Sequence, residues 1–174
     1  MKSSVVIRPM DDDVPKSLRL ALCETQGRLF ELSAKYGFDS ETFIRAYMTS
    51  PVSADMDKSF HHMQWAGEGY IMERMMDELR DQLSKGEEIY GIEILHWMGY
   101  LYRHWHFQTG EKSTAIYKQA PAKVMRNVYP MYHTMDPDMA VERLKESYSD
   151  RHPSTKVRPR SCDGRDSKKT YLHP

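Results

Sequence analysis

Apolar residues recur every three or four positions along most of this 174-residue chain. That spacing is the period of an α-helix that buries one face. Gly37, Gly86 and Gly110 follow the three longest stretches with this period, and a glycine commonly comes directly after the last turn of a helix. These stretches predict long helices over residues 15–36, 69–85 and 89–109.

Shorter helices are predicted between the long ones and after the last of them. Ser50 followed by Pro51, and Asp136 followed by Pro137, each combine a capping side chain with a residue suited to the first helical turn. Outside Val5–Ile7, no segment has the alternation of a strand. The predicted short helices cover residues 40–49, 51–59, 113–119, 120–128 and 137–148. The sequence therefore predicts an all-α fold, a single compact multi-helix domain of about seven helices.

The predicted helical domain spans residues 15–148. Residues 1–14 have no helical period and are expected to form a flexible N-terminal arm. Residues 149–174 hold three prolines and few large apolar residues, which predicts a disordered C-terminal tail. From residue 150 onward, seven Lys and Arg against three Asp give this tail a net charge of +4.

Charge and cysteine content limit the cellular compartments and the classes of partner that fit this chain. The chain carries 25 basic and 25 acidic residues, so no global field attracts nucleic acid or an anionic membrane. Cys23 and Cys162 are its only cysteines and form neither a disulfide framework nor a zinc-binding spacing, as expected in a reducing cytosol. The N-terminus lacks a signal-peptide pattern, and the longest apolar-rich run, Ile94–Tyr102, is far shorter than the roughly 20 residues that span a bilayer. We expect a cytoplasmic protein with no membrane association.

The segment Leu95–Phe107, LHWMGYLYRHWHF, holds two of the three Trp and three of the eight His residues of the chain. On a helical wheel its large apolar residues fill one wide arc, which is typical of a central core helix. Gly99 and Arg103 share a second, narrower stripe with His96 and His106. This stripe is the candidate binding site, because Arg103 can bind a carboxylate or phosphate and Gly99 leaves room for a ligand or partner. The alternative is that Arg103 forms an internal ion pair and the His residues are core groups.

The same segment argues against a metal site. His104 and His106 point about 160° apart on a helix and so cannot share one metal ion. The chain has no nucleophile elbow, phosphate-binding loop, dinucleotide fingerprint or zinc-protease motif. We therefore expect no metal, no cofactor and no catalytic residue. An enzyme that holds an anionic substrate through Arg103 is the least favoured of three functional hypotheses.

Residues 32–48 have the pattern of a helix–turn–helix: a helix, a glycine at the turn, a polar cap and a second amphipathic helix. The string from Gly37 to Tyr47 loosely resembles the second helix pair of AraC-type regulators. In such a DNA-binding transcriptional regulator, Thr42 and Arg45 would contact DNA. Two acidic residues lie at the start of the second helix, and the net charge gives a nucleic-acid partner no support. Ordinary packing of two antiparallel helices is the alternative.

Two longer blocks carry a family resemblance. One begins ETQGRLFELSAKYGFDSETFIRAYMTS and the other begins LHWMGYLYRHWHFQTGEKSTAIYKQAPAKVM. Over residues 18–146 they resemble an uncharacterised family of small bacterial all-helical proteins that are often encoded near toxin–antitoxin modules. The resemblance implies an antitoxin-like or accessory component that binds a protein partner, such as a cognate toxin. The leading hypothesis is therefore a cytosolic protein-interaction module that uses either the Arg103 stripe or the Met-rich helix Ile71–Leu83.

Overall fold

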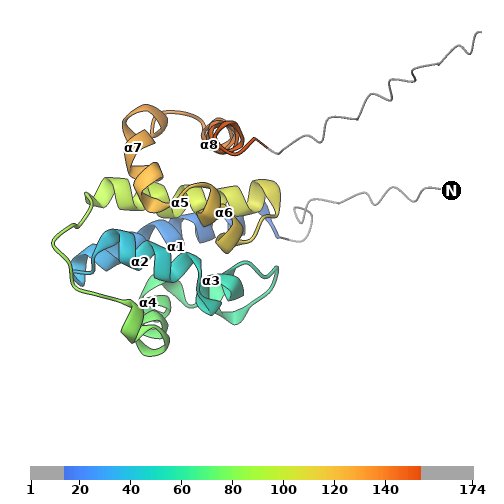
Figure 1. Ribbon diagram of the computed structural model, residues 1–174. Coiled ribbons are helices and arrows are strands. Elements are labelled where there is room, and N and C mark those ends of the chain that lie inside the picture. The colour runs from blue at the N-terminus through green and yellow to red at the C-terminus, as the bar shows by residue number, and fades with distance from the viewer. Residues whose placement is uncertain (1–13, 154–174) are drawn as a thin grey trace, which may run out of the picture.

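The computed structural model of the protein describes residues 14–153 (Figure 1). These residues form eight α-helices, two short 3-10 helices and no strand, so the predicted all-α fold is confirmed. The α-helices are α1 (Lys16–Lys35), α2 (Ser40–Met48), α3 (Pro51–Met56), α4 (Gly67–Glu78), α5 (Ile92–Thr109), α6 (Ser113–Gln119), α7 (Ala122–Tyr132) and α8 (Pro137–Arg151). The 3-10 helices are η2 (His62–Trp65) and η3 (Arg80–Gln82).

Helices α1 and α5 form the centre of the fold and pack against each other more extensively than any other pair. Helix α4 packs against α1, whereas α7 and α8 cover α5 from the other side (Figure 1). Phe30 of α1 and Leu95, Met98 and Trp105 of α5 are fully buried. The aromatic-rich helix is therefore central, as its wheel predicts.

Two glycines allow α1 and α5 to cross closely. A Cβ atom on Gly99 would lie 2.4 Å from Gln26 O and 2.9 Å from Gly27 Cα. A Cβ atom on Gly27 would lie 2.8 Å from Cε1 of His96. The space beside Gly99 is therefore filled by the backbone of α1, and it does not hold room for a ligand.

Four of the helix boundaries that a local signal marks are confirmed, whereas the helix end predicted at Gly86 is wrong because α4 ends at Glu78. Ser50 and Asp136 each accept a backbone hydrogen bond at the start of α3 and α8. Gly37 and Gly110 adopt φ angles of 72° and 71°, the left-handed conformation that ends a helix without a steric cost to glycine.

The helices predicted over residues 69–85 and 89–109 are shorter than expected. Helix α4 ends at Glu78, η3 follows, and residues 83–91 are not helical. Asp39 N donates to Ser84 O at 2.9 Å, and Tyr90 N donates to Ser40 Oγ at 2.9 Å. These bonds hold the connection against the start of α2, which delays the start of α5 to residue 92.

The ends of three helices and the limits of the folded domain also differ from the prediction. Helix α3 ends before residue 59, α7 continues past 128 with Pro130 in its last turn, and α8 passes the predicted domain end at residue 148. Val14, the last residue of the predicted arm, is buried. The rest of that arm, the strand-like Val5–Ile7 and the tail beyond residue 153 lie outside the described residues.

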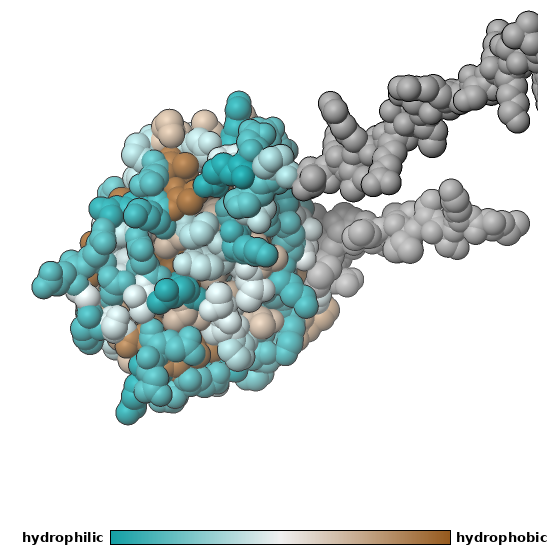
Figure 2. Space-filling model, viewed as in Figure 1, coloured by the Kyte–Doolittle hydropathy of each residue, from teal (hydrophilic) through white to brown (hydrophobic). Residues whose placement is uncertain are grey.

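The face of the domain shown in Figure 2 is largely hydrophilic. On the face shown in Figure 2, hydrophobic residues reach the surface only in small separate patches. Scattered apolar residues are normal on a folded protein, so recognition sites must be sought in hollows that gather several of them.

Candidate functional site

Arg103, the centre of the predicted binding stripe, lies inside the protein with an exposed fraction of 0%. Its Nη1 donates to Asp57 Oδ1 at 2.8 Å and to Met56 O at 3.1 Å. Its Nε donates to Gln26 Oε1 at 2.9 Å. Arg103 is thus committed to an internal ion pair and offers no contact to an anionic ligand, which removes the residue on which the enzyme hypothesis depends.

Asp57, the partner of Arg103, follows α3 directly and joins it to α5 and α6. Ser113 donates from its backbone N to Oδ2 at 2.8 Å and from its Oγ to Oδ1 at 2.7 Å. Burial by itself would raise the pKa of the Asp57 carboxyl. The charge of Arg103 and the hydrogen bonds from Ser113 outweigh it and hold that pKa below its ordinary value.

Gln26 ties α1 into the same network and is almost fully buried. Its Nε2 donates to Gly99 O at 3.0 Å, and its Oε1 accepts from Tyr47 Oη and Arg103 Nε, both at 2.9 Å. A buried polar side chain whose hydrogen bonds are satisfied is compatible with a core. The position of Gln26 within the apolar stripe of α1, between Leu22 and Leu29, is the sequence signal for this role.

His106 borders the same network. It is 5% exposed, and its Nδ1 donates to Glu111 O at 2.7 Å while lying 3.7 Å from Asp57 Oδ1. Burial and the charge of Arg103 lower the pKa of His106, so its imidazole is neutral at neutral pH. The outer edge of the ring lines a hollow of about 370 Å³ together with Lys58 and Lys112.

We predict that folding stability falls as the pH drops below the ordinary His pKa of 6.5. Above that pH both states hold a neutral His106, whereas below it the unfolded chain binds a proton that the folded protein excludes. The slope from this group is at most about 1.4 kcal/mol per pH unit, the value for one proton. Urea unfolding at pH 7, 6 and 5 measures it. A His106→Gln variant should be less stable at pH 7 but show a flatter pH dependence, and equal slopes would contradict the assignment.

His96 lies apart from Arg103 and His106, at the outer edge of the contact between α1 and α5. Its Nδ1 is 2.6 Å from Glu31 Oε1, and its Nε2 is 3.3 Å from Glu24 Oε2. Its side chain is 30% exposed. The structure therefore divides the predicted stripe: Arg103 and Gly99 are internal, His106 borders them, and His96 belongs to a different surface.

That surface is a groove of about 500 Å³ between α1, α5 and α7, which we call the aromatic groove. Its lining residues are Glu31, Ile92, Glu93, His96, Trp97, Tyr100, Tyr129 and His133. The rings of Trp97 and Tyr129 meet edge to face with their centroids 5.4 Å apart, and Tyr129 stacks on His133. Tyr129 comes from α7 and His133 directly follows it, and no local pattern in the sequence connects α7 with α5.

Most residues of the two other surfaces predicted from the sequence, α2 and α4, are wholly or partly buried against the rest of the protein. In α2, the helix expected to contact DNA, six of nine residues are buried, Thr42 is half-buried and Arg45 is exposed. This helix packs against α1, α6 and α7, so it does not project a face that could enter a major groove. In the Met-rich helix α4, Ile71, Met72 and Met75 are fully buried and form part of the core.

No group of three or more His, Cys, Asp or Glu side chains within residues 14–153 is arranged to hold a metal ion. Of the helices in that range, none combines the length and the apolar composition needed to cross a membrane. Comparisons of the chain with protein-family models, with characterised proteins and with solved structures give no significant match.

Proposed function

We propose that this protein is a helical protein-interaction module that binds its partner through the aromatic groove. The observation that carries the proposal is the gathering of partly exposed Trp97, Tyr100 and Tyr129 around one concave surface. Aromatic residues are enriched among those that contribute most of the binding energy at protein interfaces. Concavity allows them to surround an inserted side chain.

The charges around the groove favour a basic partner. Glu93 lines it without an ion pair to any residue in the range 14–153. Glu31 and Glu24 share the single ring of His96, which leaves a net negative charge, and no Lys or Arg is among the lining residues. Aromatic faces and carboxylates together attract the side chains of Lys and Arg, by cation–π contact and by ion pairing. We therefore propose a partner segment that presents a Lys or Arg beside an apolar residue.

The family resemblance adds a source for this partner. An antitoxin-like or accessory component of a toxin–antitoxin locus would bind the product of a neighbouring gene and cover its active surface. The groove can make such a contact because Trp97, Tyr100 and Tyr129 are only half-buried, although Trp97 also packs against the core.

We predict that Ile92→Lys weakens capture of a co-expressed neighbouring gene product by about tenfold or more. Ile92 is 50% exposed at the groove, so the new ammonium removes apolar contact and repels a basic partner residue without disturbing the core. Ile89→Lys is the matched control, because Ile89 is 42% exposed and lies outside the groove lining. Affinity purification followed by calorimetric titration measures the effect.

Two results would count against the proposal. Ile92→Lys and Ile89→Lys would have equal effects on binding if the groove were not the contact surface. If no neighbouring product binds the wild-type protein, and co-expression relieves no growth inhibition, the toxin–antitoxin role is removed.

A further inference from the structure

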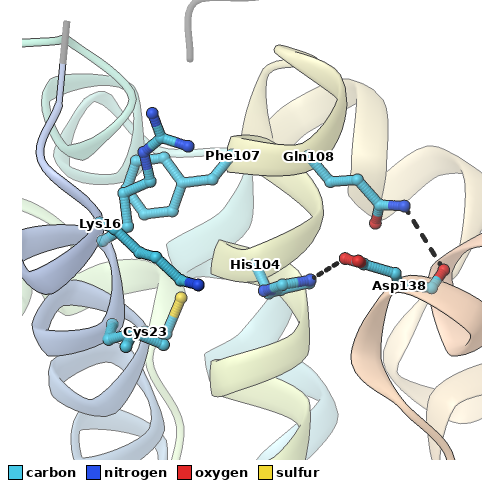
Figure 3. Close-up of a pocket in the computed structure, with 8 residues that line it drawn as sticks. Lys16, Cys23, His104, Phe107, Gln108 and Asp138 are labelled. Atoms are coloured by element: carbon cyan, nitrogen blue, oxygen red, sulfur yellow. Dashed lines mark hydrogen bonds and ion pairs between the residues drawn. The ribbon is translucent and has the colours of Figure 1, made fainter. Parts of the chain in front are cut away.

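A second hollow lies on the opposite end of α5, between α1, α5 and the first turn of α8 (Figure 3). Its volume is about 340 Å³, which is within the range of sites for small organic molecules. It shares no lining residue with the aromatic groove. We call it the α8 pocket.

One side of the α8 pocket is uncharged and mostly apolar. Leu20 lies at its rim with 47% exposure, Phe107 is half-buried, and Cys23 is 1% exposed. Burial raises the pKa of the Cys23 thiol to about 12, so the group is an uncharged thiol at neutral pH. This side can therefore accept an apolar ring or chain.

The other lining groups are polar, and the charge that is available to a ligand is positive. Figure 3 shows the Lys16 ammonium between α1 and α5, next to Cys23 and facing His104. Lys16 makes no ion pair with any residue in the range 14–153. The one lining carboxylate, Asp138, is already paired with His104, whose Nε2 is 2.7 Å from Asp138 Oδ1.

The pocket also contains an unused acceptor. Gln108 Nε2 donates weakly to Asp138 O at 3.4 Å, and Gln108 Oε1 is buried and accepts no hydrogen bond from any described residue. A buried acceptor without a donor is costly, and most such atoms in folded proteins are paired. Because this atom is buried, the Gln108 amide must rotate toward the pocket before a ligand N–H or O–H group satisfies it.

We propose that the α8 pocket binds a small organic carboxylate with an apolar body and one hydrogen-bond donor. The carboxylate pairs with Lys16, the apolar body packs on Leu20, Cys23 and Phe107, and the donor reaches Gln108 Oε1. This site is independent of the aromatic groove, because the lining residues and the sign of the available charge differ.

Titration with indole-3-propionate tests the proposal, since this probe combines a carboxylate, an aromatic body and an N–H donor. Amide chemical shifts of the full-length protein should change saturably at residues 16–23 and 104–108. Lys16→Met should weaken binding about fivefold, the effect of one exposed ion pair, and Leu20→Glu about tenfold. Lys35→Met, at the other end of α1, should leave binding unchanged. Both Lys16 and Lys35 are exposed, so neither substitution disturbs the core.

The neutral indole-3-propionamide separates charge recognition from apolar contact, and it should bind about fivefold more weakly than the acid. Equal binding of acid and amide, or no saturable change at low-millimolar probe, would overturn the proposal. The Ile92→Lys variant should bind the probe normally. Its behaviour therefore distinguishes a failure of this site from a failure of the aromatic groove.

Discussion

Replacing Asp57 with alanine will lower the free energy of unfolding by about 3–5 kcal/mol, the cost of removing one partner from a buried ion pair. Arg103 would keep its charge at an exposed fraction of 0% with only neutral acceptors around it. Ser113 would at the same time lose the acceptor of its backbone N and of its hydroxyl. Urea unfolding followed by far-UV circular dichroism measures the loss.

Two comparisons make this result specific to the buried pair. Glu88→Ala removes a carboxylate that pairs with Arg126 on the surface, where the side chains are 58% and 46% exposed. That change should cost at most about 1 kcal/mol. The double variant Asp57→Ala with Arg103→Met removes both charges and should recover part of the loss. A loss below about 1 kcal/mol in the single variant, or strictly additive effects in the double variant, would show that the pair does not organise the core.

The helices could be predicted because their signals are local. The three- and four-residue spacing, the capping pairs at residues 50–51 and 136–137, and the glycines after α1 and α5 all act within one or two turns. The predictions are wrong where contacts with distant segments of the chain determine the local conformation. Residues 83–91 leave the helical conformation because they bond to the start of α2, which lies more than forty residues earlier in the chain.

The candidate site likewise combines a local feature that the sequence predicts with long-range contacts that it does not. The helical wheel correctly groups Gly99, Arg103 and His106 on one narrow stripe of α5, but it contains no information about what packs against that stripe. The structure places Gln26 and Asp57 there, which turns a predicted binding surface into an internal network. Gln26 had a sequence signal as a polar residue within an apolar stripe, whereas Asp57 had none.

Helix α5 therefore has two faces with different surroundings. Its Gly99–Arg103–His106 side holds α1, α3 and α6 together, and its His96–Trp97–Tyr100 side faces the aromatic groove. A residue on the first side will affect binding only through stability. Substitutions intended to map recognition should therefore be placed at exposed positions of the groove, because a loss of binding after a core substitution would have no single cause.

A single methyl group at Gly99 is expected to have a large effect. Gly99→Ala should destabilise the protein by about 3 kcal/mol, the upper part of the range for overpacked cores. The added Cβ would lie 2.4 Å from Gln26 O and 2.8 Å from Gln26 C, which are backbone atoms and cannot rotate away. Helices α1 and α5 would have to separate, which also lengthens the hydrogen bond from Gln26 Nε2 to Gly99 O and disturbs the acceptor of Arg103 Nε. Thermal and urea unfolding measure the loss.

Gly69→Ala is the matched control and should have the opposite sign. Gly69 lies within α4, is exposed, and has no atom within 4 Å of a Cβ built on it. Alanine there removes backbone freedom from the unfolded chain without a clash, so it should stabilise the protein by about 0.4–1 kcal/mol. If both substitutions were stabilising, the close crossing of α1 and α5 would not be the arrangement in solution. A loss of stability in Gly99→Ala together with a gain in Gly69→Ala would show that Gly99 is required for helix packing and not for ligand binding.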